Sequence, residues 1–371
     1  MKAALYSPFI PENIGGGERH LLAIAECLIE AGHRVDLILP KEKPKPSFKK
    51  QQLKSKYIKT YNLALKQLNI INGPFGKDNG SAWQRLKFTR QYDVFYYVTD
   101  GSFFISCAKR NIAHFMIPFK RPTNGFLNRL KLYFWRVKTA NSKFTKDIIE
   151  ENWGVKINYI NYGAIEKKHF KPLSKKNIIL NVGRFFTPTG GKHCKCQDFL
   201  VKVFKKMCDQ GLKNWQLILI GSIDKGRDNE VYAQRVKKSA KGYPISVKHQ
   251  ASFKTLKKNY GQAKIYWHAT GFGAGEQKNP EKMEHFGLST LEAMAAGSVP
   301  VIIKKGGQKE IVTHGKNGLF WQSKKELINQ TLKIIRDEKL WQRLSKAARK
   351  RANDFSKEKF CRKTKEIFGL P

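Results

Sequence analysis

The stretch that decides the fold is KAALYSPFIPENIGGGERHLLAIAECLIEAGHRVDLILP, residues 2–40. Its two ends, residues 2–7 and 34–40, are short apolar runs of the kind that forms buried strands. Between them lies an amphipathic segment, residues 17–32, which ends at a helix-terminating glycine, Gly32. One face of this segment carries Leu21, Ile24, Ala25 and Leu28. A strand, a helix and a strand in so short a span predict a βαβ unit, and therefore a parallel sheet covered by helices.

The alternation of strand and helix continues along the rest of the chain. Two more strands are expected at residues 92–98 and 111–117. A second series begins near residue 177, with strands at 177–183, 215–221, 264–270 and 299–304 and helices at 198–211, 288–297, 324–337, 338–353 and 356–368. We therefore predict two doubly wound α/β domains that face each other across a cleft. Ligands of such sheets bind outside the carboxyl ends of the strands.

Composition limits the classes of protein that the chain can represent. The 371 residues are 41% hydrophobic and 12% aromatic, which is enough for two buried cores and excludes wholesale disorder. No uncharged apolar run reaches the roughly 18 residues that a spanning helix needs. The apolar stretch at the N-terminus is too short for a secretory signal, and the six cysteines are scattered. We expect a cytoplasmic protein with free thiols, with peripheral attachment to the inner membrane face as an alternative.

The chain is strongly basic, since 71 Lys and Arg residues against 29 Asp and Glu residues give a formal net charge of +42. Such a charge bears on partners rather than on fold. Three interpretations stay open: a generally Lys-rich surface, attraction to an anionic membrane face or lipid-phosphate acceptor, and binding of nucleic acid. No DNA- or RNA-binding motif supports the third interpretation, so we expect no specific nucleic-acid partner.

Basic residues are concentrated in residues 101–146, which contain ten Lys or Arg residues and no Asp or Glu. Within this region FLNRLKLYFWRVK, residues 126–138, mixes large apolar and basic side chains, as helices on membrane surfaces do. The alternative is a buried stripe of Leu127, Leu130 and Phe134 at helical spacing. We expect burial of these three residues, and keep the membrane interpretation for the basic face and the other aromatic residues.

The sharpest motif is EHFGLSTLEAMAAG, residues 284–297. We expect Gly287 to open a helix, because the N–H groups and the dipole at a helix N-terminus bind phosphate well. Ser289 and Thr290 add hydroxyl donors in the first turn of this helix. The segment therefore predicts a phosphate-binding site at the edge of the second domain's sheet.

Two glutamates, Glu284 and Glu292, bracket this helix start. Glu292 lies where a carboxylate can accept hydrogen bonds from a ribose diol, and Glu284 lies on the preceding loop, where it would face a sugar. The alternative is that both acids merely favour a helix N-terminus. Their spacing and the sequence FGLSTLEAMAAGSVPV resemble the E-x7-E signature of retaining glycosyltransferases of the GT-B fold, in particular glycosyltransferase family 4. The resemblance implies that the donor binds at Phe286, Gly287, Leu288, Ser289, Thr290 and Glu292.

Two segments of the first domain resemble the same family. Gly16 and Gly17 belong to a glycine triplet after the first strand, where backbone N–H groups can approach a phosphate closely. Taken alone, such a triplet is also an ordinary turn. His114 is at the end of a predicted strand and resembles a His that the family places near the donor sugar, with a packed interior His as the alternative.

Gly183 and Arg184 close the first strand of the second domain and resemble the family's Gly-Arg motif. In that motif the Arg and a following Lys hold the donor diphosphate. An insertion separates the two here, so the partner is either Lys192 or Lys195, and we favour Lys195. Fixed cations can stabilise the leaving phosphate in place of a metal ion, so we expect no cofactor and no divalent metal. The stretch 193–196 lacks the second ligand pair that a zinc site needs.

The resemblance implies two Rossmann-like domains, residues 1–172 for the acceptor and 173–354 for the donor, with a helix at 355–371 that packs back on the first. It implies a retaining, metal-independent hexosyltransferase that uses a UDP- or GDP-linked sugar and a glycan or lipid-linked acceptor. The catalytic residues would be Glu284, His114, Arg184 and Lys195. The alternative function is a non-catalytic basic module of the same fold that binds anionic lipid or polymer. A phosphorylase or an epimerase of this fold would need catalytic patterns of its own. For a phosphorylase, the sequence lacks the lysine context that anchors its cofactor.

Overall fold

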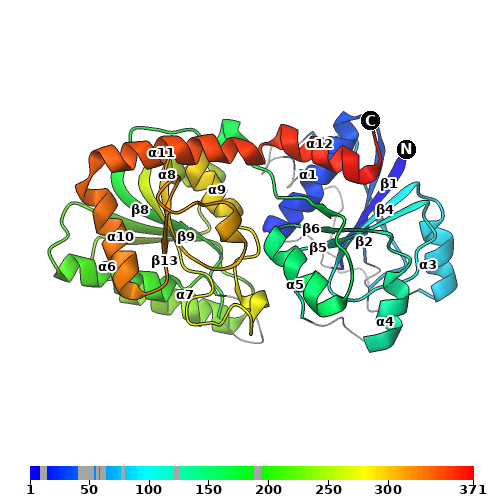
Figure 1. Cartoon of the computed structure of the whole chain (residues 1–371), viewed down its shortest axis with the longest axis horizontal. Helices are drawn as coiled ribbons and strands as arrows, with labels where there is room; N and C mark the ends of the chain where they lie inside the picture. Colours follow the sequence, from blue (N-terminus) through cyan, green and yellow to red (C-terminus); the bar gives the residue numbers. More distant parts are fainter. Residues whose placement is uncertain are drawn as a thin grey trace. The chain divides into compact units, whose positions relative to one another are not determined.

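The computed structural model of the chain describes residues 1–8, 15–40, 54–55, 58, 64–76, 80–120, 125–187 and 194–371. The chain forms two compact units (Figure 1). The N-terminal unit contains Met1–Ala164 and Glu358–Pro371, and the C-terminal unit contains Ile165–Lys357.

The boundary between the units follows Ala164, whereas the sequence placed it after residue 172. The residues in between bond within the C-terminal unit. The Ile165 N–H donates to the Phe355 carbonyl at 3.0 Å, and the Leu173 N–H donates to the Gly261 carbonyl at 3.0 Å. Residues 165–173, which include Pro172, therefore belong to the C-terminal unit through their backbone hydrogen bonds.

The N-terminal unit contains a parallel sheet of seven strands in the order β3-β2-β1-β4-β5-β6-β7. The strands are β1 (Lys2–Tyr6), β2 (Arg34–Leu39), β3 (Asn69–Asn72), β4 (Val94–Thr99), β5 (Arg110–Phe115), β6 (Val137–Ala140) and β7 (Tyr159–Ile160). The described helices are α1 (Gly16–Glu30), α3 (Ala82–Thr89), α4 (Gly125–Leu132), α5 (Lys143–Trp153) and α12 (Lys357–Phe368). The predicted βαβ unit is confirmed, because β1 pairs with β2 in parallel and α1 connects them.

The C-terminal unit contains a second parallel sheet, of six strands in the order β10-β9-β8-β11-β12-β13. Its strands are β8 (Lys176–Val182), β9 (Gln216–Gly221), β10 (Ile245–His249), β11 (Ala263–His268), β12 (Val299–Ile303) and β13 (Leu319–Trp321). Its α-helices are α6 (Gln197–Asp209), α7 (Arg227–Ser239), α8 (Phe253–Gln262), α9 (Leu288–Ala295), α10 (Lys324–Arg336) and α11 (Glu338–Ala352). Short 3₁₀ turns are η1 (Lys167–His169), η2 (Pro280–Lys282), η3 (Gly306–Glu310) and η4 (Asn353–Phe355).

Both faces of the first sheet are buried. Ala3 and Leu5 of β1 join a cluster with α1 and α12, whereas Ala4 and Tyr6 join a second cluster that contains Trp135. This alternation is the two-residue period of a strand covered on both sides. No helix in the described ranges is long and apolar enough to cross a bilayer.

The last helix, α12, belongs to the N-terminal unit (Figure 1). Phe368 stacks on Tyr96 at 5.6 Å, and the Arg110 guanidinium donates to the Ile367 carbonyl at 3.0 Å. A disulfide joins Cys361 of α12 to Cys27 of α1. The expectation of free thiols is therefore wrong for this pair, because the fold brings together two cysteines that lie 334 positions apart in the sequence. The free cysteines of the described residues are Cys107, Cys194, Cys196 and Cys208.

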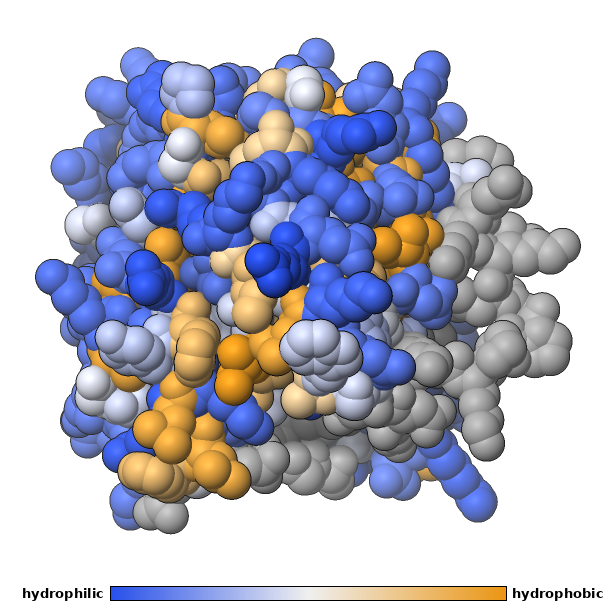
Figure 2. Space-filling model, turned by 90° about the vertical axis from the view of Figure 1, so that its right-hand side faces the viewer, coloured by the Kyte–Doolittle hydropathy of each residue, from blue (hydrophilic) through white to orange (hydrophobic). Residues whose placement is uncertain are grey.

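The expected burial of Leu127, Leu130 and Phe134 is also wrong, because all three are exposed. The buried side of α4 is formed instead by Asn128 and Leu132. The hydrophobicity of the sequence predicted burial of the face that is exposed in the structure. In Figure 2 hydrophobic side chains gather in a group near the lower edge of the surface shown.

We predict that reduction of the disulfide between Cys27 and Cys361 lowers the melting temperature. A cross-link of this kind contributes about 2–4 kcal/mol, which is roughly 5–15 °C for a unit of this size. Thermal denaturation with and without dithiothreitol measures the shift. Cys361→Ser should abolish the effect of the reductant, and Cys107→Ser, at an exposed free thiol of the same unit, should keep it. An equal response of wild type and Cys361→Ser to the reductant would contradict the prediction.

Candidate functional site

The E-x7-E segment begins at Glu284, on the loop between η2 and α9, and ends at Glu292 inside α9. Gly287 caps α9 with φ 111°, a left-handed conformation that suits glycine, and no side chain caps the helix there. The first N–H groups of a helix have no partner within it. Phe286 is buried against Phe355 at 5.6 Å between ring centroids, so its ring anchors the loop and faces the interior.

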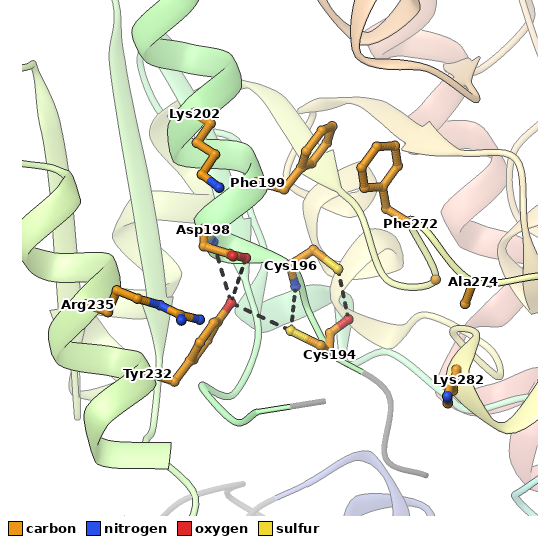
Figure 3. A pocket seen from close by; sticks show the side chains of 11 residues that line it. Cys194, Cys196, Asp198, Phe199, Lys202, Tyr232, Arg235, Phe272, Ala274 and Lys282 are labelled. Atoms are coloured by element: carbon orange, nitrogen blue, oxygen red, sulfur yellow. Dashed lines mark hydrogen bonds between the residues drawn. The ribbon is translucent and has the colours of Figure 1, made fainter. Parts of the chain in front are cut away.

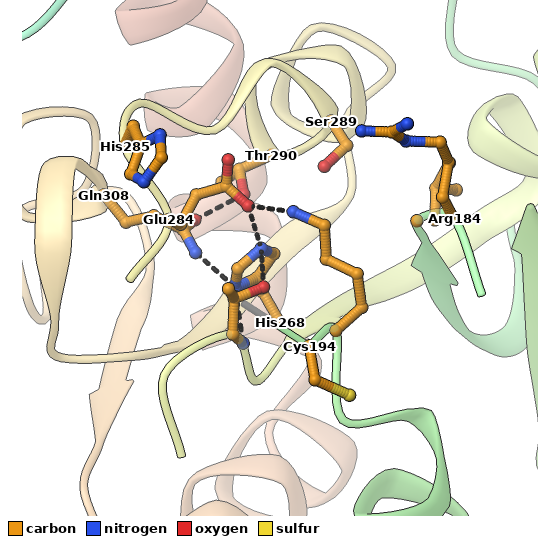
Figure 4. Close-up of polar contacts among 12 residues, drawn as sticks. Arg184, Cys194, His268, Glu284, His285, Ser289, Thr290 and Gln308 are labelled. Carbon is orange, nitrogen blue, oxygen red and sulfur yellow. Dashed lines mark hydrogen bonds and ion pairs between the residues drawn. The ribbon is translucent and has the colours of Figure 1, made fainter. Parts of the chain in front are cut away.

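Glu284 forms the centre of a bonded cluster (Figure 4). Its Oε2 atom lies 2.5 Å from Lys195 Nζ and 2.9 Å from His268 Nε2. The Glu284 and Lys195 side chains are each 15% exposed, so the ion pair is largely shielded from water. The fold therefore brings together two residues that the sequence assigned to the site and that lie 89 positions apart. Lys192, the alternative to Lys195, lies outside the described residues.

His268 connects Glu284 to a buried chain of hydrogen bonds. The Thr290 hydroxyl donates to Gln308 Oε1 at 2.5 Å, which leaves the Gln308 amide N–H₂ to donate to His268 Nδ1. The remaining ring proton is then on Nε2 and is donated to Glu284. Burial lowers the pKa of His268, although the bond to Glu284 raises it in part, so the imidazole is neutral at neutral pH.

Two glycines of η3, Gly306 and Gly307, pack closely against the backbone of Glu284 and His285. A Cβ atom on Gly306 would lie 2.3 Å from the Glu284 carbonyl oxygen, and one on Gly307 would lie 2.1 Å from the His285 carbonyl oxygen. The Gly307 N–H also donates to the Glu284 carbonyl at 2.8 Å. The close approach of these backbones is the physical reason for glycine at both positions.

Gly183 and Arg184 follow the end of β8. A Cβ atom on Gly183 would lie 2.8 Å from Cγ of Lys195, so the glycine leaves room for the Lys195 side chain. The Arg184 guanidinium pairs with Asp224 at 3.0 Å and has no bond to the Glu284 cluster in Figure 4. Each of the two cations assigned to a diphosphate is thus paired with a carboxylate in the ligand-free chain.

The remaining residues of the motif are held by tyrosines. Glu292 is buried, and the Tyr260 hydroxyl donates to its Oε2 at 2.8 Å. The Tyr266 hydroxyl donates to Ser289 Oγ at 2.8 Å. Leu288 is half-buried in the first turn of α9. Thr290 is fully buried, and its hydroxyl donates a hydrogen bond to Gln308. Of the two hydroxyl residues in the first turn of α9, Ser289 is the one that is partly exposed.

Three predicted site residues belong to the N-terminal unit. Gly16 and Gly17 are the first two residues of α1, and the preceding Gly15 is the N-cap residue, without a side-chain hydrogen bond to the helix start. His114 of β5 is fully buried, stacks on His20 at 4.4 Å and lies 2.7 Å from Thr139 Oγ1. Burial lowers the pKa of His114 well below its ordinary range. The structure thus places His114 in the interior, the alternative that the sequence left open.

Sequence reasoning did not assign His268, Gln308, Asp224 or Tyr260 to the site. One signal was available, since His268 is the last residue of β11 and ligands of parallel sheets bind at that end of the strands. Nothing in the spacing of Asp224 or Tyr260 connects them to Arg184 or Glu292, because these pairs form only in the folded unit.

A cavity of about 370 Å³ lies next to the residues that flank Lys195 (Figure 3). Its lining includes Cys194 and Cys196, basic side chains of α6 and α7, and Phe272 of the loop 271–283. Phe272 stacks on Phe199 at 3.9 Å and thereby fixes this loop to α6. Among the described residues no group of His, Cys, Asp and Glu is placed to hold a metal ion.

Comparisons with known proteins cover both units. Residues 164–351 match Glycosyl transferases group 1, and residues 14–163 match Glycosyltransferase Family 4. The chain is similar to a GDP-Man:Man(3)GlcNAc(2)-PP-Dol alpha-1,2-mannosyltransferase of Xenopus laevis, with 29% identity over 138 residues, 37% of this chain and 26% of that protein. It is similar to an uncharacterized glycosyltransferase of Methanocaldococcus jannaschii, with 25% identity over 223 residues, 53% of this chain and 48% of that protein. The matches thus span a quarter to a half of these curated relatives.

Among solved structures, the chain is similar to Anabaena HepE in complex with UDP and glucose, with a TM-score of 0.72 and 16% identity. The likeness covers 100% of this chain and 99% of that one. At this identity it shows the fold alone, which is the GT-B fold with two Rossmann-like units.

We predict that Gly307→Ala destabilises the C-terminal unit by about 1–3 kcal/mol, because the added methyl group overlaps the His285 carbonyl. Urea denaturation measures the free energy of unfolding. Gly275→Ala is the matched control, since a Cβ there meets Lys278 at an ordinary 3.7 Å. Equal stability of the two variants would contradict the packing described for η3.

We predict that the free energy of unfolding falls as the pH drops below about 6.5, the ordinary pKa of His. Because burial lowers the folded-state pKa of His268, the unfolded chain binds the proton more readily, and stability present above that pH is lost on acidification. Urea denaturation at about pH 7.5 and about pH 5.5 should show a shallower pH dependence for His268→Gln, by up to about 1.4 kcal/mol per pH unit. His20, whose pKa burial lowers to about 3, contributes equally to both proteins. The same slope in both would contradict this assignment.

Proposed function

Because the chain belongs to the Glycosyl transferases group 1 family, we propose that it transfers a hexose from a nucleotide-diphosphate sugar to a glycan or lipid-linked acceptor. The observation that carries the proposal is the bonded cluster of Glu284, Lys195 and His268 beside the uncapped N-terminus of α9. A carboxylate suited to sugar hydroxyls and a cation suited to phosphate lie side by side there. The names of similar proteins, one with GDP-mannose and one with UDP and glucose, favour a GDP- or UDP-linked donor.

In this proposal the diphosphate lies against the first N–H groups of α9 and is held by Arg184 and Lys195. A helix N-terminus and fixed cations together favour phosphate. Glu284 orients the hydroxyl groups of the sugar, and Glu292 accepts hydrogen bonds from the ribose. His268, Gln308 and Thr290 act as positioning residues, because they fix the direction in which Glu284 points.

The reaction retains the configuration at the anomeric carbon. The acceptor hydroxyl attacks from the face that the leaving phosphate vacates, and a phosphate oxygen takes the proton of the hydroxyl. The bond between the anomeric carbon and the phosphate oxygen breaks with its electron pair on the phosphate. Arg184 and Lys195 stabilise that charge without reorganisation, so the proposal requires no metal ion.

We predict that the melting temperature of the wild type rises with one nucleoside diphosphate and its sugar conjugate, in a panel of UDP, GDP and ADP compounds without metal. Ligands that bind the folded state raise it by mass action. Glu284→Gln should keep the shift with the nucleotide, lose the additional shift with the sugar conjugate and slow transfer by at least about 100-fold.

Glu338→Gln serves as the control for charge, since Glu338 pairs with Lys264 near the start of β11, whereas His268 is at the end of that strand. This variant should behave like the wild type. A full transfer rate in Glu284→Gln would remove Glu284 from the reaction. The absence of a shift with every compound would contradict nucleotide-sugar binding and favour a non-catalytic module.

A further inference from the structure

A group of large apolar side chains is exposed on α4 and on the turn that follows it. Tyr133 is 81% exposed, Phe126 74% and Leu127 65%, and Leu130 and Phe134 are 52% and 45% exposed. Nine large hydrophobic residues are exposed in the described part of the chain, and these five lie within one stretch of nine residues. Isolated apolar residues are normal on a protein surface, whereas a contiguous group marks an interaction site.

The three exposed apolar residues of α4 itself, Phe126, Leu127 and Leu130, share one side of the helix. At about 100° per residue they fall within an arc of about 100°, and Asn128 and Leu132 fall on the opposite side. The burial agrees with this arrangement, because Asn128 and Leu132 are each 3% exposed. Asn128 Oδ1 accepts the Phe103 N–H at 3.0 Å, and Leu132 joins the apolar core of the N-terminal unit. The apolar side therefore faces away from the unit to which the helix is attached.

The backbone that presents these side chains is held firmly. The N–H groups of Tyr133, Phe134 and Trp135 donate to carbonyls three residues earlier, at 3.2, 3.2 and 3.0 Å. The buried Trp135 indole donates to the Phe104 carbonyl at 2.9 Å. The exposed aromatic rings thus lie on an ordered turn between two anchored positions.

Basic residues border the apolar side and acids are absent from it. At about 100° per residue Arg129 and Lys131 lie on opposite borders of the apolar arc. Arg129 and Arg136 are exposed. The whole stretch of residues 101–146 contains ten Lys or Arg residues and no Asp or Glu. An apolar side with cationic borders matches the interface of a bilayer with anionic lipids, where apolar groups enter the acyl boundary and cations meet the headgroups.

We propose that α4 and the following turn, residues 126–136, are a docking surface for the interface of an anionic lipid bilayer. The apolar side chains and the basic borders carry this inference, which goes beyond the proposed transfer reaction because docking requires no nucleotide sugar. A second copy of the chain fits the surface poorly. A symmetric contact would bring the cationic borders of both copies together without acids of this stretch to neutralise them.

The test is co-sedimentation with phosphatidylcholine vesicles that contain either none or about 30% phosphatidylglycerol. Wild type should bind the anionic vesicles, more weakly at about 0.5 M than at about 0.15 M salt, because salt screens only the electrostatic part. Phe126→Ser with Tyr133→Ser should lower the partition coefficient at least about tenfold at both salt concentrations. Arg129→Gln with Lys131→Gln should lower it mainly at low salt. Trp83→Ser, at a residue 73% exposed on α3, is the matched control and should bind like wild type.

Three results would overturn the proposal. The first is equal vesicle binding by the Phe126→Ser, Tyr133→Ser variant and by Trp83→Ser. The second is a dimeric wild type that this double variant converts to a monomer in sedimentation velocity, which would assign the surface to a second copy. The third is wild-type binding to heparin that falls in the double variant as strongly as vesicle binding does, which would assign the surface to polyanions in general.

Vesicle binding and nucleotide binding are separable. The double variant should keep the wild-type thermal shift with nucleotides, because its substitutions lie in the N-terminal unit on exposed side chains. A loss of vesicle binding with an intact nucleotide shift supports the docking surface. A wild type that shows nucleotide shifts and no vesicle binding overturns the docking surface and leaves the proposed transfer reaction standing.

Discussion

The ion pair between Lys195 and Glu284 is the contact on which the other features of the C-terminal site depend. Both groups are largely shielded from water. An unpaired charge in such a shielded position is costly. The surrounding residues are arranged to hold the pair. Gly183 leaves space for the Lys195 chain, Gly306 and Gly307 fix the Glu284 backbone, and His268 donates its proton to the carboxylate. Gly183 follows β8, His268 ends β11 and η3 follows β12, and a parallel sheet brings such strand ends together at one edge.

The pairing of cations also qualifies the meaning of the +42 net charge. Lys195 and Arg184 are matched by Glu284 and Asp224, so the site is locally balanced although the chain is not. An anionic ligand must therefore exchange with these carboxylates. Its affinity is a difference between two sets of interactions, and this difference favours ligands that also offer hydroxyl groups to the released carboxylate. Excess positive charge of the kind seen around α4 acts instead at long range on any anionic surface.

Patterns along the sequence predicted the parallel sheets, the βαβ unit and the three helices after residue 324, because apolar periodicity and helix-ending glycines are local signals. They also indicated Glu284 and Lys195, which the fold places in contact. They did not reveal the partners of Arg184 and Glu292, or the pairing of Cys27 with Cys361, because these contacts arise from tertiary structure. The burial of α4 was assigned to the wrong side for a related reason. Hydrophobicity alone chose the apolar side, whereas the hydrogen bond of Asn128 to Phe103 turned the polar position inward.

The attachment of α12 to the N-terminal unit has a consequence for biosynthesis. Residues 358–371 complete a unit whose other residues end at Ala164, so this unit cannot reach its final form until the whole intervening unit has been translated. Domains generally fold as they emerge from the ribosome, the N-terminal one first. Here the order of completion is reversed. The nascent N-terminal unit must persist with the apolar surface beneath α12 uncovered until α12 has been translated, and apolar surface exposed in this way is prone to aggregation.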